Sequence, residues 1–232
     1  MFHFKQFTIH QDKCAMKVGT DGVLLGAWTN VENAVRILDI GTGTGLLALM
    51  LAQRAPNVLI DAIEIEENAC IQATENVAES LWKDRINIIH RALQDFEPAE
   101  KYDLIVSNPP YFLHSLKNPD TAKKTARHTD TLMPTELITH AKRLLNENGK
   151  LSVIYPTTEA LLLIKEAEKS ALHCSYITKV FPKIGANEKR LLIEFSVMPT
   201  ECRIDEMHIE NNARHDYSEK YKMLTKDFYL NF

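Results

Sequence analysis

The sequence predicts an α/β fold in which a mostly parallel, seven-stranded sheet carries helices on both faces and ends in an antiparallel hairpin. Three observations lead to this prediction. Strand-like apolar runs alternate with helix-like runs from residue 35 to residue 169. A glycine-rich stretch connects the first of these strands to the first of these helices. Two further strand-like runs are joined by PKIGANEK, whose Pro, Gly and Asn residues are typical of a turn.

The segment before the core is expected to add a small extension. Apolar residues alternate over 2–10, which indicates a strand or one arm of a hairpin. Thr20 and Asp21 precede a short apolar run and are the residue types that cap helices, so a helix is expected over 23–28.

The core elements follow in strict alternation, which implies a parallel sheet covered on both faces. Strands are expected at 35–39, 58–63, 86–89, 102–106 and 151–155, and helices at 46–54, 66–80, 134–145 and 158–169. The closing hairpin is expected to pair 173–181 with 190–197.

The chain of 232 residues is long enough for one domain with a substantial core. We expect a single domain over 1–232, divided into an N-terminal extension (1–34), a catalytic core (35–200) and a C-terminal tail (201–232). The tail is polar, but Tyr221, Leu224 and Phe228 lie near helical spacing, which predicts a short terminal helix.

Composition excludes several classes of protein. The net charge of −4 argues against a surface that is basic throughout, so any contact with nucleic acid must come from a local patch. The four cysteines form no C-x-x-C pair, and no H-E-x-x-H spacing occurs, so neither a disulfide framework nor a metal site is expected. No signal-peptide core and no long apolar run is present, so the expected location is the cytoplasm.

The stretch Asp39-Ile-Gly41-Thr42-Gly43-Thr-Gly45 follows the first core strand and opens a helix. Glycines allow a sharp turn and the close approach of a ligand to the backbone. Glu64 ends the next strand, where an acid can accept hydrogen bonds from ribose hydroxyls. In an open α/β sheet both groups belong to the crevice beyond the carboxyl ends of the strands.

Three interpretations of this loop are open: S-adenosylmethionine (SAM), a dinucleotide cofactor, or a structural turn without a ligand. The carboxylate of Asp39 favours the first, because it would repel a pyrophosphate but attract a ligand that carries an ammonium and a sulfonium.

The fourth core strand leads into Asn108-Pro109-Pro110-Tyr111, which by itself is also typical of a simple turn. Its position in the same crevice as the glycine loop favours a catalytic role. The Asn108 side-chain oxygen and the Pro109 carbonyl oxygen can each accept one hydrogen of a planar amine, which fixes the nitrogen and stabilises the positive charge that develops on it. Tyr111 offers a ring on which a nucleobase can stack.

With these motifs, the sequence resembles the N-P-P-Y class I amino-methyltransferases, and more closely the bacterial family of tRNA1(Val) adenine-37 amino-methyltransferases. The resemblance extends over nearly the whole chain, from FKQFTIHQDKCAMKVGTDGVLLGAW at the start to YSEKYKMLTKDFYLNF at the end. It implies a class I, Rossmann-like fold, SAM as the cofactor, tRNA as the partner, and methyl transfer to the exocyclic amine of the adenosine 3′ of the anticodon.

The resemblance also implies roles for particular residues. Asp39, Gly41, Thr42 and Gly43 would contact the methionine part of SAM, Gly45 would pack the following helix, Glu64 and Ile65 would hold the ribose, Asn108 to Tyr111 would hold the adenine, and Lys17, Thr20 and Asp21 would wall the pocket. Many relatives carry an acid after the third strand, but Leu93 stands there here. The contact with the SAM adenine is therefore expected from the backbone at Ala92 and Leu93 or from Asp95.

Cations close to the motifs are candidates for RNA contacts. Lys117, Lys123, Lys124 and Arg127 follow the N-P-P-Y motif, and Lys189 and Arg190 lie at the expected hairpin. The alternative for each is an ordinary solvated surface. The loop 114–131 is expected to become ordered when RNA binds.

Other functions remain as alternatives. A protein-glutamine methyltransferase would use the same motif, but such enzymes usually carry an N-terminal helical domain, and only about 34 residues precede the first core strand. A DNA-adenine methyltransferase usually needs a larger recognition region. An inactive RNA-binding module is disfavoured by the intact motifs. A nucleotide-dependent oxidoreductase is the last alternative, and stabilisation of the protein by SAM or by NAD would distinguish it.

Overall fold

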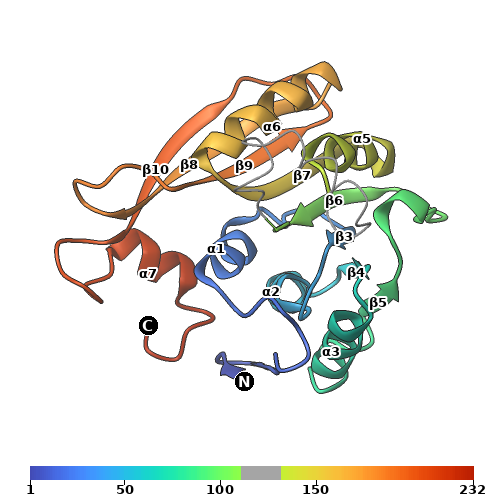
Figure 1. Cartoon of the computed structure of the whole chain (residues 1–232), viewed down its shortest axis with the longest axis horizontal. Coiled ribbons are helices and arrows are strands. Elements are labelled where there is room, and N and C mark those ends of the chain that lie inside the picture. The colour runs from blue at the N-terminus through green and yellow to red at the C-terminus, as the bar shows by residue number, and fades with distance from the viewer. Residues whose placement is uncertain (111–131) are drawn as a thin grey trace, which may run out of the picture.

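The computed structural model describes residues 1–110 and 132–232, in which eight strands form one mixed sheet (Figure 1). The strand order is β10-β8-β9-β7-β6-β3-β4-β5, and only β9 runs antiparallel to its neighbours. The strands are β3 (Arg36–Ile40), β4 (Leu59–Glu64), β5 (Ile86–His90), β6 (Tyr102–Ser107), β7 (Leu145–Pro156), β8 (His173–Lys183), β9 (Arg190–Ser196) and β10 (Arg203–Glu210). The α/β alternation and the β8–β9 hairpin are confirmed, and the sheet has one strand more than predicted.

Helices cover both faces of this sheet (Figure 1). They are α1 (Thr20–Trp28), α2 (Leu46–Arg54), α3 (Glu67–Ala78), α5 (Pro134–Leu144), α6 (Thr157–Lys169) and α7 (Glu219–Thr225). One core cluster contains buried residues of α1, α2, α3 and α7, and a second contains those of α5 and α6. A two-stranded antiparallel ribbon, β1 (Phe2–His3) with β2 (Thr8–Ile9), confirms the predicted N-terminal hairpin. No helix in the described part of the chain is both long and apolar enough to cross a membrane.

The additional strand is β10, which lies in the segment that we predicted to be a tail with a terminal helix. It pairs in parallel with β8, from Arg203 opposite Tyr176 to Glu210 opposite Lys183. Met207 is its only fully buried residue, and Ile204 is 64% exposed, so the sequence lacks the regular apolar alternation of a half-buried strand. The terminal helix itself is confirmed as α7.

Helix α1 begins earlier than predicted, at Thr20, and its N-cap is Gly19, which makes no side-chain cap. Thr20 and Asp21 therefore lie inside the helix and do not cap it. The carboxylate of Asp21 accepts a hydrogen bond from Arg190 Nε at 2.7 Å. The two residues are 169 positions apart in the sequence, so the sequence alone did not reveal that Arg190 is a partner of Asp21.

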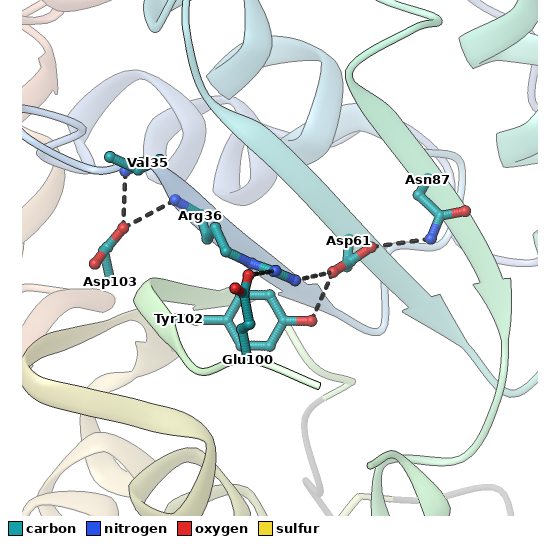
Figure 2. A network of polar contacts seen from close by, with 7 residues as sticks. All are labelled: Val35, Arg36, Asp61, Asn87, Glu100, Tyr102 and Asp103. Carbon is teal, nitrogen blue, oxygen red and sulfur yellow. Dashed lines mark hydrogen bonds and ion pairs between the residues drawn. The ribbon is translucent and has the colours of Figure 1, made fainter. Parts of the chain in front are cut away.

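A polar network joins four strands on the side of the sheet where they begin (Figure 2). The carboxylate of Asp61 in β4 accepts hydrogen bonds from Tyr102 Oη at 2.7 Å and Asn87 Nδ2 at 2.9 Å, and pairs with Arg36 at 3.1 Å. Asp103 accepts from the backbone N–H groups of Val35 and Arg36, and Glu100 pairs with the Arg36 guanidinium. These contacts fix β3, β4, β5 and β6 relative to one another, so the loops at their other ends have defined positions.

Candidate active site

The glycine loop connects β3 to α2 and folds back over the end of β4. Gly41, Gly43 and Gly45 have φ values of 70°, 58° and 82°, a region that residues with a Cβ rarely adopt. The N–H groups of Gly41 and Thr42 both donate to the carbonyl of Ile63, at 2.9 and 3.1 Å. A Cβ on Gly41 would meet no heavy atom within 4 Å, so this glycine borders open space.

Gly45 has a different role from the other two glycines. A Cβ on Gly45 would lie 3.5 Å from Ala73 Cβ, because α3 packs directly against this turn. The position therefore serves the close contact between the loop and α3, whereas the sequence resemblance implied packing of the following helix.

Glu64 ends β4, and its carboxylate is held by three backbone N–H groups. Oε2 accepts from Gly43 at 2.8 Å, and Oε1 accepts from Ile65 at 2.9 Å and from Glu66 at 3.0 Å. A carboxylate oxygen can accept two hydrogen bonds, so Oε2 keeps capacity for one more donor. Glu64 is 9% exposed and lines the cavity described below, which suits it to accept a hydroxyl of a ligand.

Asp39 is fully buried beneath the glycine loop. Its Oδ2 accepts the Thr42 hydroxyl at 2.6 Å, whereas no group in the described residues donates to Oδ1. Burial raises the pKa of Asp39 from 3.8 to about 7, the nearby Glu64 charge acts in the same direction, and the Thr42 hydrogen bond opposes it. A buried acid with an unpartnered oxygen beneath a ligand loop fits a positively charged ligand, because such a charge would favour the ionised carboxylate.

Asp39 is expected to give the ligand-free protein a pH-dependent stability. Its folded-state pKa lies above its unfolded value, so the folded state binds more protons between these values and the free energy of unfolding falls as pH rises towards 7. Between about pH 5 and about pH 8 the loss amounts to about 3 kcal/mol. In Asp39→Asn the side chain at this position cannot ionise. The free energy of unfolding of this variant, measured in urea, should therefore rise by that amount relative to the wild type over the same pH interval. A stability difference that stays constant with pH would contradict the assignment.

A cavity of about 540 Å³ lies between these groups, within the range of small-molecule sites. Eight of the residues predicted to bind ligands line it: Gly41, Gly43, Glu64, Ile65, Leu93, Asn108, Pro109 and Pro110. The structure therefore brings the glycine loop, the acid of β4 and the N-P-P segment to one crevice, beyond the carboxyl ends of β3, β4 and β6.

Asn108 is positioned by the end of β6 and by α1. The hydroxyl of the preceding Ser107 donates to the Ile40 carbonyl at 2.8 Å, which ties the end of β6 to the end of β3. Gly22 of α1 is buried, and a Cβ on it would lie 3.6 Å from Asn108 Nδ2 and 3.0 Å from Leu46 Cδ2. A glycine thus allows α1 to approach the Asn108 side chain closely.

The segment after β5 contributes Arg91, Leu93 and Gln94 to the cavity. Leu93 begins a 3-10 turn (Leu93–Asp95) and is 5% exposed. Of the two expected contacts for the SAM adenine, the one at Leu93 lies at the cavity, whereas Asp95 is exposed and does not line it.

Several predicted residues do not line the cavity. Asp39 lies beneath the loop, Thr42 is a buried residue within the loop, Gly45 packs α3, and Thr20 is exposed on α1. Lys17 Nζ donates to the Gln11 carbonyl, and Asp21 pairs with Arg190, a residue that we predicted to contact RNA. Lys189 is exposed at the β8–β9 turn. The other predicted residues lie outside the described part of the chain. They are Tyr111, Lys117, Lys123, Lys124 and Arg127, together with the whole loop 114–131.

Sequence reasoning missed other residues of the cavity wall. They are Cys14, Ala15, Met16, Ile40, Ile63, Glu66, Glu67, Ala69, Arg91, Gln94 and Leu132. Most flank a predicted motif, so their proximity in sequence was the available signal. Cys14 to Met16 are different, because they come from the segment before α1 and reach the cavity only through tertiary packing. In the described part of the chain, no three His, Cys, Asp or Glu side chains gather as metal ligands.

Solved structures with the same architecture are methyltransferases. A predicted O-methyltransferase from Agrobacterium tumefaciens superposes with a TM-score of 0.69 at 18% identity, covering 90% of this chain and 96% of its own. The N-methyltransferase NodS from Bradyrhizobium japonicum superposes with a TM-score of 0.52 at 18% identity, covering 75% and 91%. The fold is therefore that of the class I, Rossmann-like methyltransferases.

Comparison of sequences narrows this class. The family described as Methyltransferase small domain matches residues 18–167. A protein from Parabacteroides distasonis named tRNA1(Val) (adenine(37)-N6)-methyltransferase is 50% identical over 232 residues, covering 99% of this chain and 97% of its own. One of the same name from Bacteroides thetaiotaomicron is 49% identical over 230 residues, with the same coverage. The chain belongs to the family of tRNA1(Val) (adenine(37)-N6)-methyltransferases.

Proposed function

We propose that the protein uses SAM to methylate the exocyclic amine of an unpaired adenine in tRNA, at the adenosine 3′ of the anticodon of tRNA-Val. The observation that carries this proposal is that Asn108, Pro109 and Pro110 line the same cavity as Gly41, Gly43 and Glu64. An amine acceptor site and a cofactor site therefore share one crevice. The names of the relatives support the choice of RNA and of the nucleotide, and a tRNA substrate supports a cytoplasmic location.

The cofactor half of the crevice is proposed to hold SAM, which supplies a methyl group on a positively charged sulfur. The open space beside Gly41 admits the ligand next to the backbone, and the free capacity of Glu64 Oε2 suits a ribose hydroxyl. The carboxylate of Asp39 supplies negative charge beneath the loop without lining the cavity. The carboxylate of Asp39 disfavours a pyrophosphate in this loop, because the two negative charges would repel each other.

The acceptor half is proposed to work through hydrogen bonds rather than through a general base. The side-chain oxygen of Asn108 and the carbonyl oxygen of Pro109 accept the two amine hydrogens. This arrangement turns the nitrogen lone pair towards the methyl donor and stabilises positive charge as it forms on nitrogen. Asn has no side-chain pKa in the accessible range, and Pro has no N–H to compete with the amine. Stacking of the base on Tyr111 remains part of the proposal on the strength of the motif.

The direct test is transfer of tritium from labelled SAM into total tRNA that lacks this modification, followed by nucleoside analysis. We expect label in N6-methyladenosine of tRNA-Val, and none in duplex DNA or in protein glutamine. Labelling of protein instead would support the glutamine alternative, and absence of label from all three substrates would overturn the proposal.

RNA is proposed to lie along the carboxyl edge of the sheet, from Asn108 towards β10. Strands β6, β7, β8 and β10 all run in the same direction in the sheet. The β8–β9 turn and the segment after β10 therefore lie at the same edge of the sheet as the cavity. The Ile184 N–H donates to the Asn211 carbonyl at 3.2 Å and joins these two segments. Lys183, Lys189 and Arg214 are exposed there, and none forms an ion pair with a described residue.

The surface is long enough for contacts with more than one nucleotide. Four strand intervals separate β6 from β10, which is about 19 Å at the usual spacing of ~4.8 Å. This distance is long enough to accompany several nucleotides of an RNA strand. Arg190 adjoins the surface, but it is held by Asp21 and contributes less charge.

Neutralising Lys183, Lys189 and Arg214 to alanine is expected to weaken tRNA binding and to lower the slope of log K against log salt by about 2–3, because each cation releases one counterion from a phosphate. The measurement is a salt titration of tRNA affinity. The matched control removes three exposed lysines elsewhere, Lys83, Lys101 and Lys165, and thus the same net charge. Equal slopes for the two triple variants would remove this surface from the RNA site.

A further inference from the structure

The segment between the N-terminal ribbon and α1 forms one wall of the cavity. Residues 10–18, here called the strap, contain neither helix nor strand. Cys14, Ala15 and Met16 at its centre line the cavity. Cys14 is 6% exposed, and its Sγ lies 4.0 Å from the position that a Cβ on Gly43 would take, so the strap packs onto the glycine loop.

The side-chain amide of Asn76, a buried residue of α3, holds the strap in place. Asn76 is 1% exposed, and its side chain makes three hydrogen bonds. Oδ1 accepts the His10 N–H at 2.8 Å, while Nδ2 donates to the His10 carbonyl at 2.9 Å and to the Thr44 carbonyl at 2.8 Å. Thr44 lies between Gly43 and Gly45, so a single side chain binds the strap and the glycine loop together.

A second buried amide holds the strap one turn earlier on α3. Gln72 is also 1% exposed; its Oε1 accepts the Lys13 N–H at 3.1 Å and its Nε2 donates to Glu75 at 3.2 Å. The Glu75 carboxylate in turn pairs with the Lys13 ammonium. Within the strap, Gln11 Oε1 accepts the Val18 N–H at 2.7 Å, which closes the segment on itself.

Buried polar groups without partners are costly, so two fully buried amides in one helix face call for a reason. Here each amide satisfies backbone groups of the strap that no strand or helix satisfies. The partners of Asn76 include the carbonyl of a residue in the cofactor loop. The amides therefore determine where the cavity wall lies, as well as how α3 packs.

We propose that Asn76 and Gln72 are positioning residues for the cofactor: they hold the strap against the glycine loop, so that Cys14 to Met16 close the cavity around SAM. This inference rests on the proposed SAM site but not on the identity of the methyl acceptor. Neither amide lines the cavity, so both act through the strap and the loop.

Asn76→Leu keeps the branched shape and removes all three hydrogen bonds. We expect the Kd for SAM, measured by calorimetry, to rise at least about tenfold, with a similar rise in the KM for SAM and a kcat at saturating SAM within about threefold of the wild type. Gln72→Met removes a single bond to the strap and should raise the Kd about threefold. The milder variant keeps the test decisive if Asn76→Leu folds poorly.

Two controls separate positioning from general loss of stability. Thr74→Ala changes an exposed residue of the same helix, whose hydroxyl bonds only to the Cys70 carbonyl, and should leave the Kd unchanged. Leu163→Ala opens the other core cluster and should destabilise the fold without affecting SAM affinity. If Leu163→Ala weakens SAM binding as much as Asn76→Leu at equal loss of stability, the amides have only a structural role and the proposal is overturned.

Hydrogen exchange of the ligand-free protein gives a readout that needs neither SAM nor activity. In Asn76→Leu the His10 amide should lose protection, and in Gln72→Met the Lys13 amide should lose it, while the amides of α5 stay protected. Unchanged protection of the His10 amide would refute the proposal that Asn76 holds the strap, even if SAM binding failed for another reason. Failure of the wild type to bind SAM would overturn the assigned role and the proposed function alike, whereas failure to label tRNA would affect only the acceptor proposal.

Discussion

Asn108→Ala is expected to lower kcat for methyl transfer by about 10²–10³-fold, the usual effect of removing one preorganised hydrogen-bonding group that acts on developing charge. The oxygen of Asn108 accepts an amine hydrogen most strongly when the nitrogen carries positive charge, so its loss falls on the transition state. The Kd for SAM should change less than about threefold, because Glu64, Asp39 and the glycine loop are untouched.

Single-turnover methylation of tRNA and calorimetry with SAM measure the two quantities separately. Asn57→Ala, in an exposed turn before β4, is the matched control and should behave as the wild type. Methyl transfer at the wild-type rate by Asn108→Ala would rule out the amine-binding mechanism. A large loss of SAM affinity with unchanged kcat would instead move Asn108 from the acceptor half of the crevice to the cofactor half.

Glu64→Gln is expected to raise the Kd for SAM by about 10–100-fold, from the loss of hydrogen bonds to a charged acceptor worth ~1.5–3 kcal/mol. The carboxylate accepts from Gly43 on one oxygen and from Ile65 and Glu66 on the other. An amide has a single acceptor atom, so in either orientation its NH₂ group must face a backbone N–H. The variant therefore disturbs the loop and also loses the free acceptor at Oε2.

Calorimetry with SAM measures this effect, and kcat at saturating SAM should fall much less than the affinity. Glu147→Gln, which changes an exposed acid on the far side of the sheet, removes the same charge and should bind SAM as the wild type does. An unchanged Kd for Glu64→Gln would show that this acid only supports the loop and makes no contact with the cofactor.

The catalytic core was predictable because local sequence determines it. Ile37, Leu38 and Ile40 are all buried, as a parallel strand covered on both faces requires, and each core helix begins or ends close to its expected residue. The three glycines follow directly from the sharp turn between β3 and α2. Asn108 and Glu64 could be placed in one crevice because they lie at the carboxyl ends of β6 and β4, parallel strands on either side of β3.

What the sequence did not reveal depends on contacts between distant segments. Strand β10 is positioned by its pairing with β8, and only one of its residues is buried. Its apolar pattern therefore predicts a strand only weakly. The same pairing brings the sulfurs of Cys174 and Cys202 to 3.2 Å, although their spacing in sequence suggested no contact. Asp21 and Arg190, each predicted to meet a ligand, meet one another. The strap was recognised as part of a family signature, but its contact with the cavity arises only in three dimensions.

The polar network around Asp61 (Figure 2) lies towards the amino ends of the strands, whereas Gly41, Glu64 and Asn108 lie at their carboxyl ends. Alignment of the strands is thus secured by groups that take no part in recognition. An enzyme built in this way can exchange its acceptor loop for another during evolution without risking collapse of the scaffold. The same architecture is found in methyltransferase structures that are only 18% identical to this chain, so the scaffold tolerates extensive change in sequence.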